Sequence, residues 1–221
     1  MLPFFISYPS DHFYLAKLFN HHPMNSFETL LLDLGLSWFM AKLAPYIISI
    51  LLGFILFFSL KKIYSGKRYK WFIYVPLLFA PFALYFILYP IYEGDFSNNS
   101  KTVNTAIELG NENELIVVAI PNCPFCFESI AKLKRVKQRI PEAQIQFLVC
   151  TENENDLQTY KIESQGLFEI KKISNYQDLA ILVDNKFPSF ILLKENQQVQ
   201  IWNNSAFGVS AIDEAEGFIG R

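Results

Sequence analysis

Two long uncharged apolar runs constrain this chain more than any other feature. Residues 43–60, LAPYIISILLGFILFFSL, and residues 71–92, WFIYVPLLFAPFALYFILYPIY, contain no charged side chain. As helices with a rise of about 1.5 Å per residue, they would extend about 27 and 33 Å, close to the roughly 30 Å hydrocarbon core of a bilayer. Both are rich in phenylalanine, with Trp and Tyr near their ends, as in the aromatic belts of membrane proteins. We therefore predict two transmembrane helices, with a pair of buried core helices as the alternative.

The loop between the two runs predicts their orientation. Residues 61–70, KKIYSGKRYK, carry five basic side chains, and short basic loops stay on the cytoplasmic side of a membrane. Both termini are then expected on the periplasmic side of a bacterial inner membrane, in a multi-pass protein. The chain has no basic domain and no arginine-rich tail, so we expect no nucleic-acid partner.

The N-terminal segment, residues 1–42, does not have the pattern of a cleaved signal peptide. Residues 27–40, FETLLLDLGLSWFM, are apolar but interrupted by Asp33. We predict an interfacial helix on the outer membrane surface that leads into the first span. A simple extension of that span is the alternative.

A polar, turn-rich linker at residues 93–102 separates the membrane region from a domain at residues 103–221. Its apolar runs predict alternating strands and helices, and hence an α/β fold with a mixed sheet flanked by helices. The expected elements are a strand at 114–120, a helix at 124–139, a strand at 144–150, helices at 154–166 and about 176–184, a hairpin within 189–203 and a closing helix at 210–220.

The cysteines carry the chemistry of this domain. Cys123 and Cys126 follow the 114–120 strand and open the next helix, where unpaired N–H groups and the helix dipole stabilise a thiolate. Pro124 suits the first helical turn, and Cys126 lies about one turn further on, within reach of a mixed disulfide on Cys123. A zinc clip would need more ligands, and the three histidines all precede the first apolar run. These positions favour a redox pair, and Cys150, at the end of an apolar strand, is expected to be a buried, inert thiol.

The segments ELIVVAIPNCPFC and NKFPSFILLKENQQVQIW, with the order of elements around them, resemble the thioredoxin superfamily. The resemblance covers residues 103–221 and includes a resemblance to membrane-anchored periplasmic thiol–disulfide oxidoreductases; the membrane region resembles no family that we recognise. The resemblance implies a cis Phe187–Pro188 bond facing the cysteines, with the Phe187 backbone pairing with substrate. It also implies that Pro124 and Phe125, between the cysteines, contact substrate.

Three departures from the family pattern stand out. Val117 occupies the position where many members carry a buried acid that relays protons to the second cysteine, which leaves Glu114 or water for that role. Asn122 replaces the usual tryptophan before the motif. Residues 151–183 are longer than the simplest family pattern, and we interpret them as an insert and a candidate docking surface for a partner.

These observations predict a membrane-anchored thiol–disulfide oxidoreductase with Cys123 as attacking thiol and Cys126 as resolving thiol. Its substrates would be extracytoplasmic protein cysteines, and no metal or organic cofactor is expected. Because the spans contain no cysteine, a separate membrane or soluble thiol partner would have to reset the pair. The alternative function is a thioredoxin-like binding or assembly subunit of a larger membrane complex.

Overall fold

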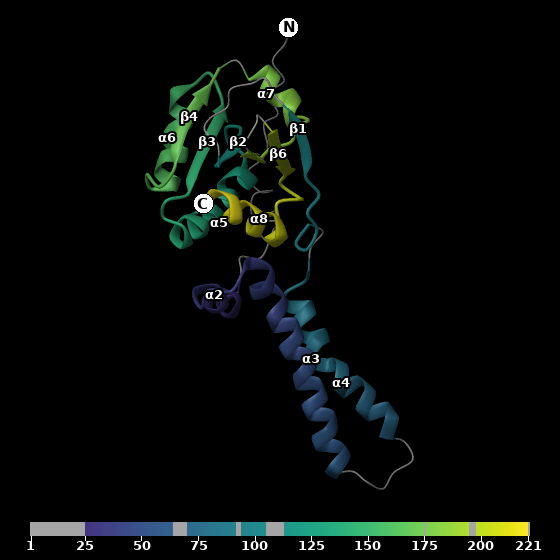
Figure 1. Cartoon of the computed structure of the whole chain (residues 1–221). Coiled ribbons are helices and arrows are strands. Elements are labelled where there is room, and N and C mark those ends of the chain that lie inside the picture. Colours follow the sequence, from purple (N-terminus) through teal and green to yellow (C-terminus); the bar gives the residue numbers. More distant parts are fainter. Residues whose placement is uncertain are drawn as a thin grey trace. The chain divides into compact units, whose positions relative to one another are not determined.

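The computed structural model describes residues 25–63, 70–91, 94–104, 113–174, 176–194 and 198–220. It divides the chain into two compact units (Figure 1). One comprises Met1–Leu36 and Ala41–Pro90, and the other comprises Ser37–Met40 and Ile91–Arg221. The short segment Ser37–Met40 therefore belongs with the C-terminal unit, although it precedes both apolar runs.

Three helices build the described part of the chain before residue 90: α2 (Ser26–Asp33), α3 (Trp38–Ile63) and α4 (Lys70–Leu88). The prediction of one helix over residues 27–40 is wrong. Helix α2 stops at Asp33, and Gly35 has a φ of 90°, a conformation that glycine adopts at little cost. The chain then starts a new helix at Trp38.

Polar contacts in the N-terminal unit attach α2 to the two long helices. Asn25 and Glu28 form a reciprocal capping box at the start of α2. The Glu28 side chain, only 1% exposed, lies 3.8 Å from the Lys42 ammonium and accepts a 3.3 Å hydrogen bond from the Tyr85 hydroxyl. The buried carboxylate is thus paired, as a charge removed from water requires.

In the part of the chain that the structure describes, one helix is long and apolar enough to cross a membrane, over Trp38–Lys61. The apolar part of α4, Tyr74–Leu88, is shorter than a full crossing, and residues 64–69 of the predicted basic loop lie outside the described residues. The two helices approach closely at Gly53. A Cβ added there would lie 2.0 Å from the Leu78 carbonyl oxygen. Small residues allow such contacts between apolar helices.

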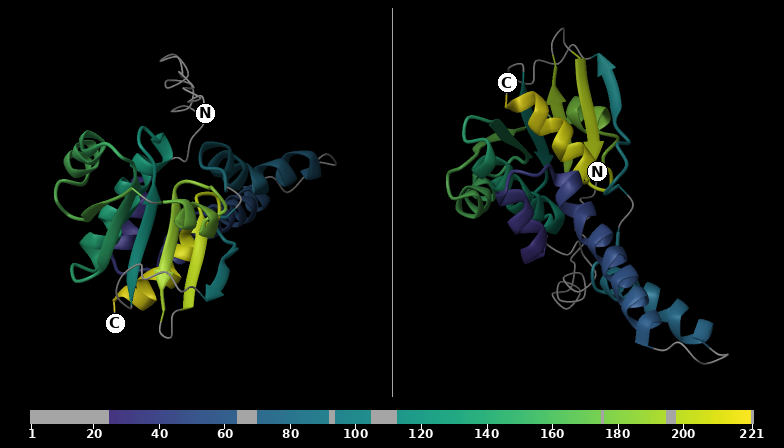
Figure 2. Two further views of the ribbon diagram at one scale, coloured as in Figure 1. Left: turned by 90° about the horizontal axis from the view of Figure 1, so that it is seen from above. Right: turned by 60° about the horizontal axis from the view of Figure 1, so that its bottom comes forward.

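The C-terminal unit is built on one mixed sheet, seen from two further directions in Figure 2. Its described strands run in the order β1-β6-β5-β2-β3-β4. Strand β2 is parallel to β3 and β3 to β4, whereas β5 is antiparallel to β2 and β6, and β1 is antiparallel to β6. The strands are β1 (Lys101–Asn104), β2 (Glu114–Ala119), β3 (Gln144–Cys150), β4 (Glu169–Ile173), β5 (Ser189–Leu193) and β6 (Gln198–Asn203), and the helices are α5 (Pro124–Arg139), α6 (Glu154–Ser164), α7 (Gln177–Leu182) and α8 (Val209–Ile219).

Helices flank both faces of this sheet. On one face, Leu179 and Val183, in α7 and at its end, pack with Ile116 and Val118 of β2 in a single apolar cluster. On the other face, Tyr160 of α6 packs between Phe127 of α5 and Phe147 of β3. The predicted α/β class and mixed sheet are therefore confirmed for the C-terminal unit.

Two described strands, β1 and β4, were absent from the prediction. Strand β1 contains Lys101 and Thr102, which the prediction assigned to the linker. Strand β4 lies within the 151–183 insert, together with α6 and α7. The insert thus adds an edge strand to the sheet as well as two helices.

Candidate functional site

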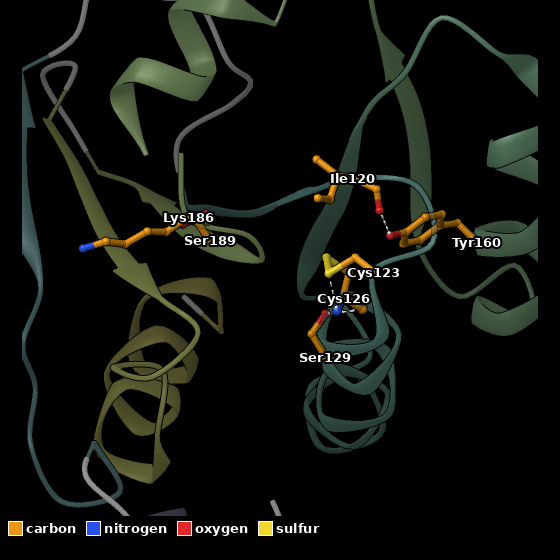
Figure 3. The surroundings of a disulfide bond; sticks show 7 residues. All are labelled: Ile120, Cys123, Cys126, Ser129, Tyr160, Lys186 and Ser189. Carbon is orange, nitrogen blue, oxygen red and sulfur yellow. Dashed lines mark hydrogen bonds between the residues drawn. A yellow bond between two sulfur atoms is a disulfide. The ribbon is translucent and has the colours of Figure 1, made fainter. Parts of the chain in front are cut away.

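The disulfide-bonded pair Cys123–Cys126 lies where β2 gives way to α5 (Figure 3). After Ile120 the chain turns through Pro121 and Asn122, and Asn122 has a φ of 55°, in the left-handed region that Asn tolerates better than most residues. Cys123 is then the N-cap residue of α5, and Pro124 occupies the first helical turn. The sequence prediction of the helix over residues 124–139 is confirmed, and with it the place of both cysteines.

The first turn of α5 directs N–H groups at Cys123. The Cys126 amide lies 3.2 Å from the Cys123 sulfur, and the Phe127 amide donates to the Cys123 carbonyl at 3.2 Å. Together with the positive end of the helix dipole, this environment favours a negative charge on the sulfur of Cys123 when the pair is reduced. Cys126 is completely buried, while Cys123 is 7% exposed and Phe125, between them, is 38% exposed. Cys123 is therefore the more accessible residue of the pair.

The predicted cis peptide bond between Phe187 and Pro188 is present. Ser189, the first residue of β5, pairs with Val118 of β2, so this bond lies beside the end of β2 that leads to the disulfide. The Ser189 hydroxyl donates to the Lys186 carbonyl at 2.6 Å, which closes the turn that carries Phe187 and Pro188 (Figure 3). Pro188 is buried and Phe187 is partly exposed.

Tyr160 of α6 also belongs to this region, and the sequence did not single it out. Its hydroxyl donates a 2.8 Å hydrogen bond to the carbonyl of Ile120 (Figure 3). Its ring stacks on Phe127 with the centroids 4.8 Å apart. The side chain is fully buried, and burial raises the pKa of the phenol above its usual value, with Asp156 and Cys150 adding to the effect. Tyr160 therefore remains a neutral hydrogen-bond donor. A lone tyrosine in a predicted helix gives no sequence signal for this contact.

Acid–base groups near Cys126 differ from the family pattern. Val117, at the position of the usual acid, is fully buried in β2. Glu114 is the first residue of β2, six residues before Ile120, which corresponds to roughly 20 Å along an extended strand. Glu128, in the second turn of α5, has a carboxyl pKa raised by burial, against the lowering effect of Lys132.

Cys150 is buried, as expected, and is not in a disulfide. It lies in the apolar cluster that α7 covers, and burial raises the pKa of its thiol to about 11. Among the described residues, no group of three or more His, Cys, Asp or Glu side chains is arranged to hold a metal ion.

Two solved structures are among those to which the chain is similar. A secreted Mycobacterium tuberculosis disulfide oxidoreductase homologous to E. coli DsbE is 14% identical, with a TM-score of 0.40 over 48% of this chain and 82% of that chain. StoA from Bacillus subtilis is 10% identical, with a TM-score of 0.32 over 54% of this chain and 97% of that chain. No protein-family model matches the chain. No curated protein matches it either.

The C-terminal unit has the features that the sequence motifs led us to expect of a thioredoxin-like domain. The assignment depends on features of this structure: the mixed sheet, the C-x-x-C disulfide at the start of α5 and the cis bond at Pro188.

Proposed function

We propose that this protein is a membrane-anchored thiol–disulfide oxidoreductase that acts on protein cysteines outside the cytoplasm. The observation that supports the activity is the Cys123–Cys126 disulfide at the N-terminus of α5, with the Cys126 amide 3.2 Å from the Cys123 sulfur. A disulfide next to helix N–H groups has a good leaving thiolate, because those groups stabilise the charge that develops on the sulfur.

The proposed exchange transfers two electrons: one disulfide bond breaks and another forms in its place. In the oxidising direction, a substrate thiolate attacks the Cys123 sulfur, the Cys123–Cys126 bond breaks and Cys126 leaves as a thiolate that takes up a proton. A second substrate thiolate then attacks the mixed disulfide, which releases an oxidised substrate and leaves Cys123 as a thiolate. The reducing direction is the reverse, with Cys123 attacking a substrate disulfide and Cys126 resolving the mixed disulfide. In both directions a separate thiol or disulfide partner must reset the pair.

In this proposal Pro188, Phe187, Pro124 and Phe125 form the surface that holds the substrate chain beside Cys123. The partial exposure of Phe187 and the 38% exposure of Phe125 support this role, because apolar rings open to solvent beside a reactive sulfur suit an extended apolar peptide.

The proposed anchor comprises two spans, 43–60 and 71–92, with the C-terminal domain in the periplasm. Only 17% of the apolar window in α3 is buried, whereas a core helix of a soluble protein would be mostly covered. Many apolar side chains of α3 and α4 are more than a third exposed, which suits contact with lipid. They include Ile47, Ile48, Ile50, Leu51, Leu52, Phe54, Ile55 and Phe58 on α3, and Val75, Phe79, Leu84, Phe86, Ile87 and Leu88 on α4.

The second candidate function is a binding or assembly subunit of a membrane complex, with the 151–183 insert as its docking surface. Two isoleucines of the insert favour it, since Ile162 on α6 is 73% exposed and Ile181 on α7 is 69% exposed. Under this function the thiols would be dispensable.

A trapping experiment separates the two functions. A Cys126→Ala variant retains the proposed attacking thiol but cannot resolve a mixed disulfide, so we expect it to accumulate covalent adducts that dithiothreitol releases and that identify the substrates. A Cys123→Ser, Cys126→Ser variant is the matched control and should form none. Full function of the double variant in cells, with no adducts on Cys126→Ala, would contradict the enzyme and support the assembly subunit.

A further inference from the structure

We infer that Tyr160, in the 151–183 insert, is a positioning residue for the Cys123–Cys126 pair. This inference rests on the proposed redox function and gives the insert a role within the site. Tyr160 contacts both sides of the pair: the chain segment that leads into it, through Ile120, and the helical residue that follows it, Phe127.

The segment that Tyr160 contacts needs support from outside. Between the end of β2 and Cys123, Asn122 takes a positive φ of 55°, which costs free energy for any residue other than glycine. Such a conformation persists when surrounding contacts determine it. The hydrogen bond from the Tyr160 hydroxyl to the Ile120 carbonyl, at 2.8 Å, fixes the chain two residues before Asn122.

This support acts on the environment of the sulfur. The Ile120 carbonyl oxygen is directed to the Tyr160 hydroxyl (Figure 3), and Cys123 then lies at the N-cap, where the Cys126 amide faces its sulfur. Loss of the Tyr160 hydroxyl would leave the Ile120 carbonyl without this partner and allow the turn to move. The chain would then adopt the N-cap geometry less often, and the Cys123 thiolate would be less stabilised.

The stack on Phe127 adds a second constraint from the same side chain. Phe127 follows Cys126 directly, and its amide donates to the Cys123 carbonyl at 3.2 Å. The Tyr160 ring, fully buried between Phe127 and Phe147, thus fixes the first turn of α5 against the sheet. Tyr160 touches neither sulfur, so its effect on the reaction is indirect.

The test compares Tyr160→Phe with the wild type, both full-length, in detergent and reduced. Tyr160→Phe removes only the hydroxyl and retains the ring. The readouts are the pH profile of Cys123 alkylation by iodoacetamide and the equilibrium of the pair with glutathione. We expect Cys123 of the variant to react about fivefold more slowly near pH 7, the effect of about one net hydrogen bond, with the alkylation profile moved to higher pH.

Trp202→Phe is the matched control. Trp202, in strand β6, is also fully buried, and its indole N–H donates to the Asn98 side chain at 2.6 Å, so this variant also removes a buried hydrogen bond. It should lower the melting temperature without moving the alkylation profile. Phe127→Leu removes the stacking partner and should move the profile in the same direction as Tyr160→Phe.

A Tyr160→Phe variant that loses stability but keeps the wild-type profile and glutathione equilibrium would overturn the inference and leave the proposed function intact. A wild-type Cys123 with an ordinary thiol profile and no exchange with glutathione would instead overturn the proposed function, and the inference with it.

Discussion

At the scale of single residues, Cys150 differs from the other two cysteines because it is a thiol outside the disulfide, buried in an apolar cluster. Its thiol pKa is raised from 9.0 to about 11 because the apolar cluster around it disfavours the charged form. The folded state therefore holds the Cys150 proton at pH values where the unfolded chain has lost it. The stability that this provides is complete below about pH 9 and is lost as the pH rises towards 11.

We accordingly expect a Cys150→Val variant to lose less stability than the wild type between pH 8.5 and 10.5. The difference should be on the order of 2 kcal/mol, since one pKa unit corresponds to about 1.4 kcal/mol. Thermal unfolding at each pH, with the Cys123–Cys126 disulfide kept oxidised, measures it. Parallel pH profiles for the two proteins would show that Cys150 ionises normally.

At the scale of elements, helix α8 holds the first turn of α3. The Asp213 carboxylate accepts hydrogen bonds from the Trp38 amide at 2.7 Å and the Phe39 amide at 2.8 Å, and Glu216 accepts from the Trp38 indole at 2.7 Å. The pKa of Glu216 is raised by burial, against the lowering effects of Trp38 and Arg139. A helix leaves its first N–H groups without partners inside the helix. At the start of α3, the Asp213 side chain accepts from two of them, although it lies 175 and 174 residues away from Trp38 and Phe39 in the sequence.

An Asp213→Ala variant should therefore be less stable by about 1–2 kcal/mol, the usual cost of losing a helix cap. Residues 34–40 should also become more sensitive to protease. Asp178→Ala, in the first turn of α7 and exposed, is the control and should change neither property. Equal protease sensitivity of Asp213→Ala and the wild type would show that Ser37–Met40 does not depend on α8.

Individual strands and helices of the C-terminal unit show how much of the fold the sequence predicts. Strands β2 and β3 and helix α5 were predictable because each is a sustained apolar pattern, and Pro124 marks the start of the helix. Strand β4, EIKKI, alternates charge with a few apolar residues and exists because it pairs with the edge of β3, a tertiary cause that local pattern does not contain. The contact between Tyr160 and Ile120 could not be predicted from the sequence for the same reason, because it joins residues 40 positions apart.

At the scale of the whole molecule, the connection between the units bears on the number of membrane crossings. In the proposed topology, α3 begins on the side of the membrane that holds the C-terminal domain, and the membership of Ser37–Met40 in the C-terminal unit agrees with this. A chain that leaves this side through α3 and returns to it must cross the bilayer an even number of times. Although the described apolar part of α4, Tyr74–Leu88, is short, this connectivity supports α4 as the returning span of the proposed topology.

The proposed topology predicts opposite labelling of two engineered cysteines. In a background with Cys123, Cys126 and Cys150 replaced by serine, Asn99→Cys, an exposed position, should react with a membrane-impermeant maleimide in spheroplasts. Ser65→Cys, in the basic loop, should react only after the membrane is permeabilised, because short basic loops remain in the cytoplasm. Labelling of both cysteines in intact spheroplasts would contradict a second crossing. Labelling of Ser65→Cys alone would place the redox domain in the cytoplasm, where disulfides are kept reduced, and would contradict the proposed function together with the topology.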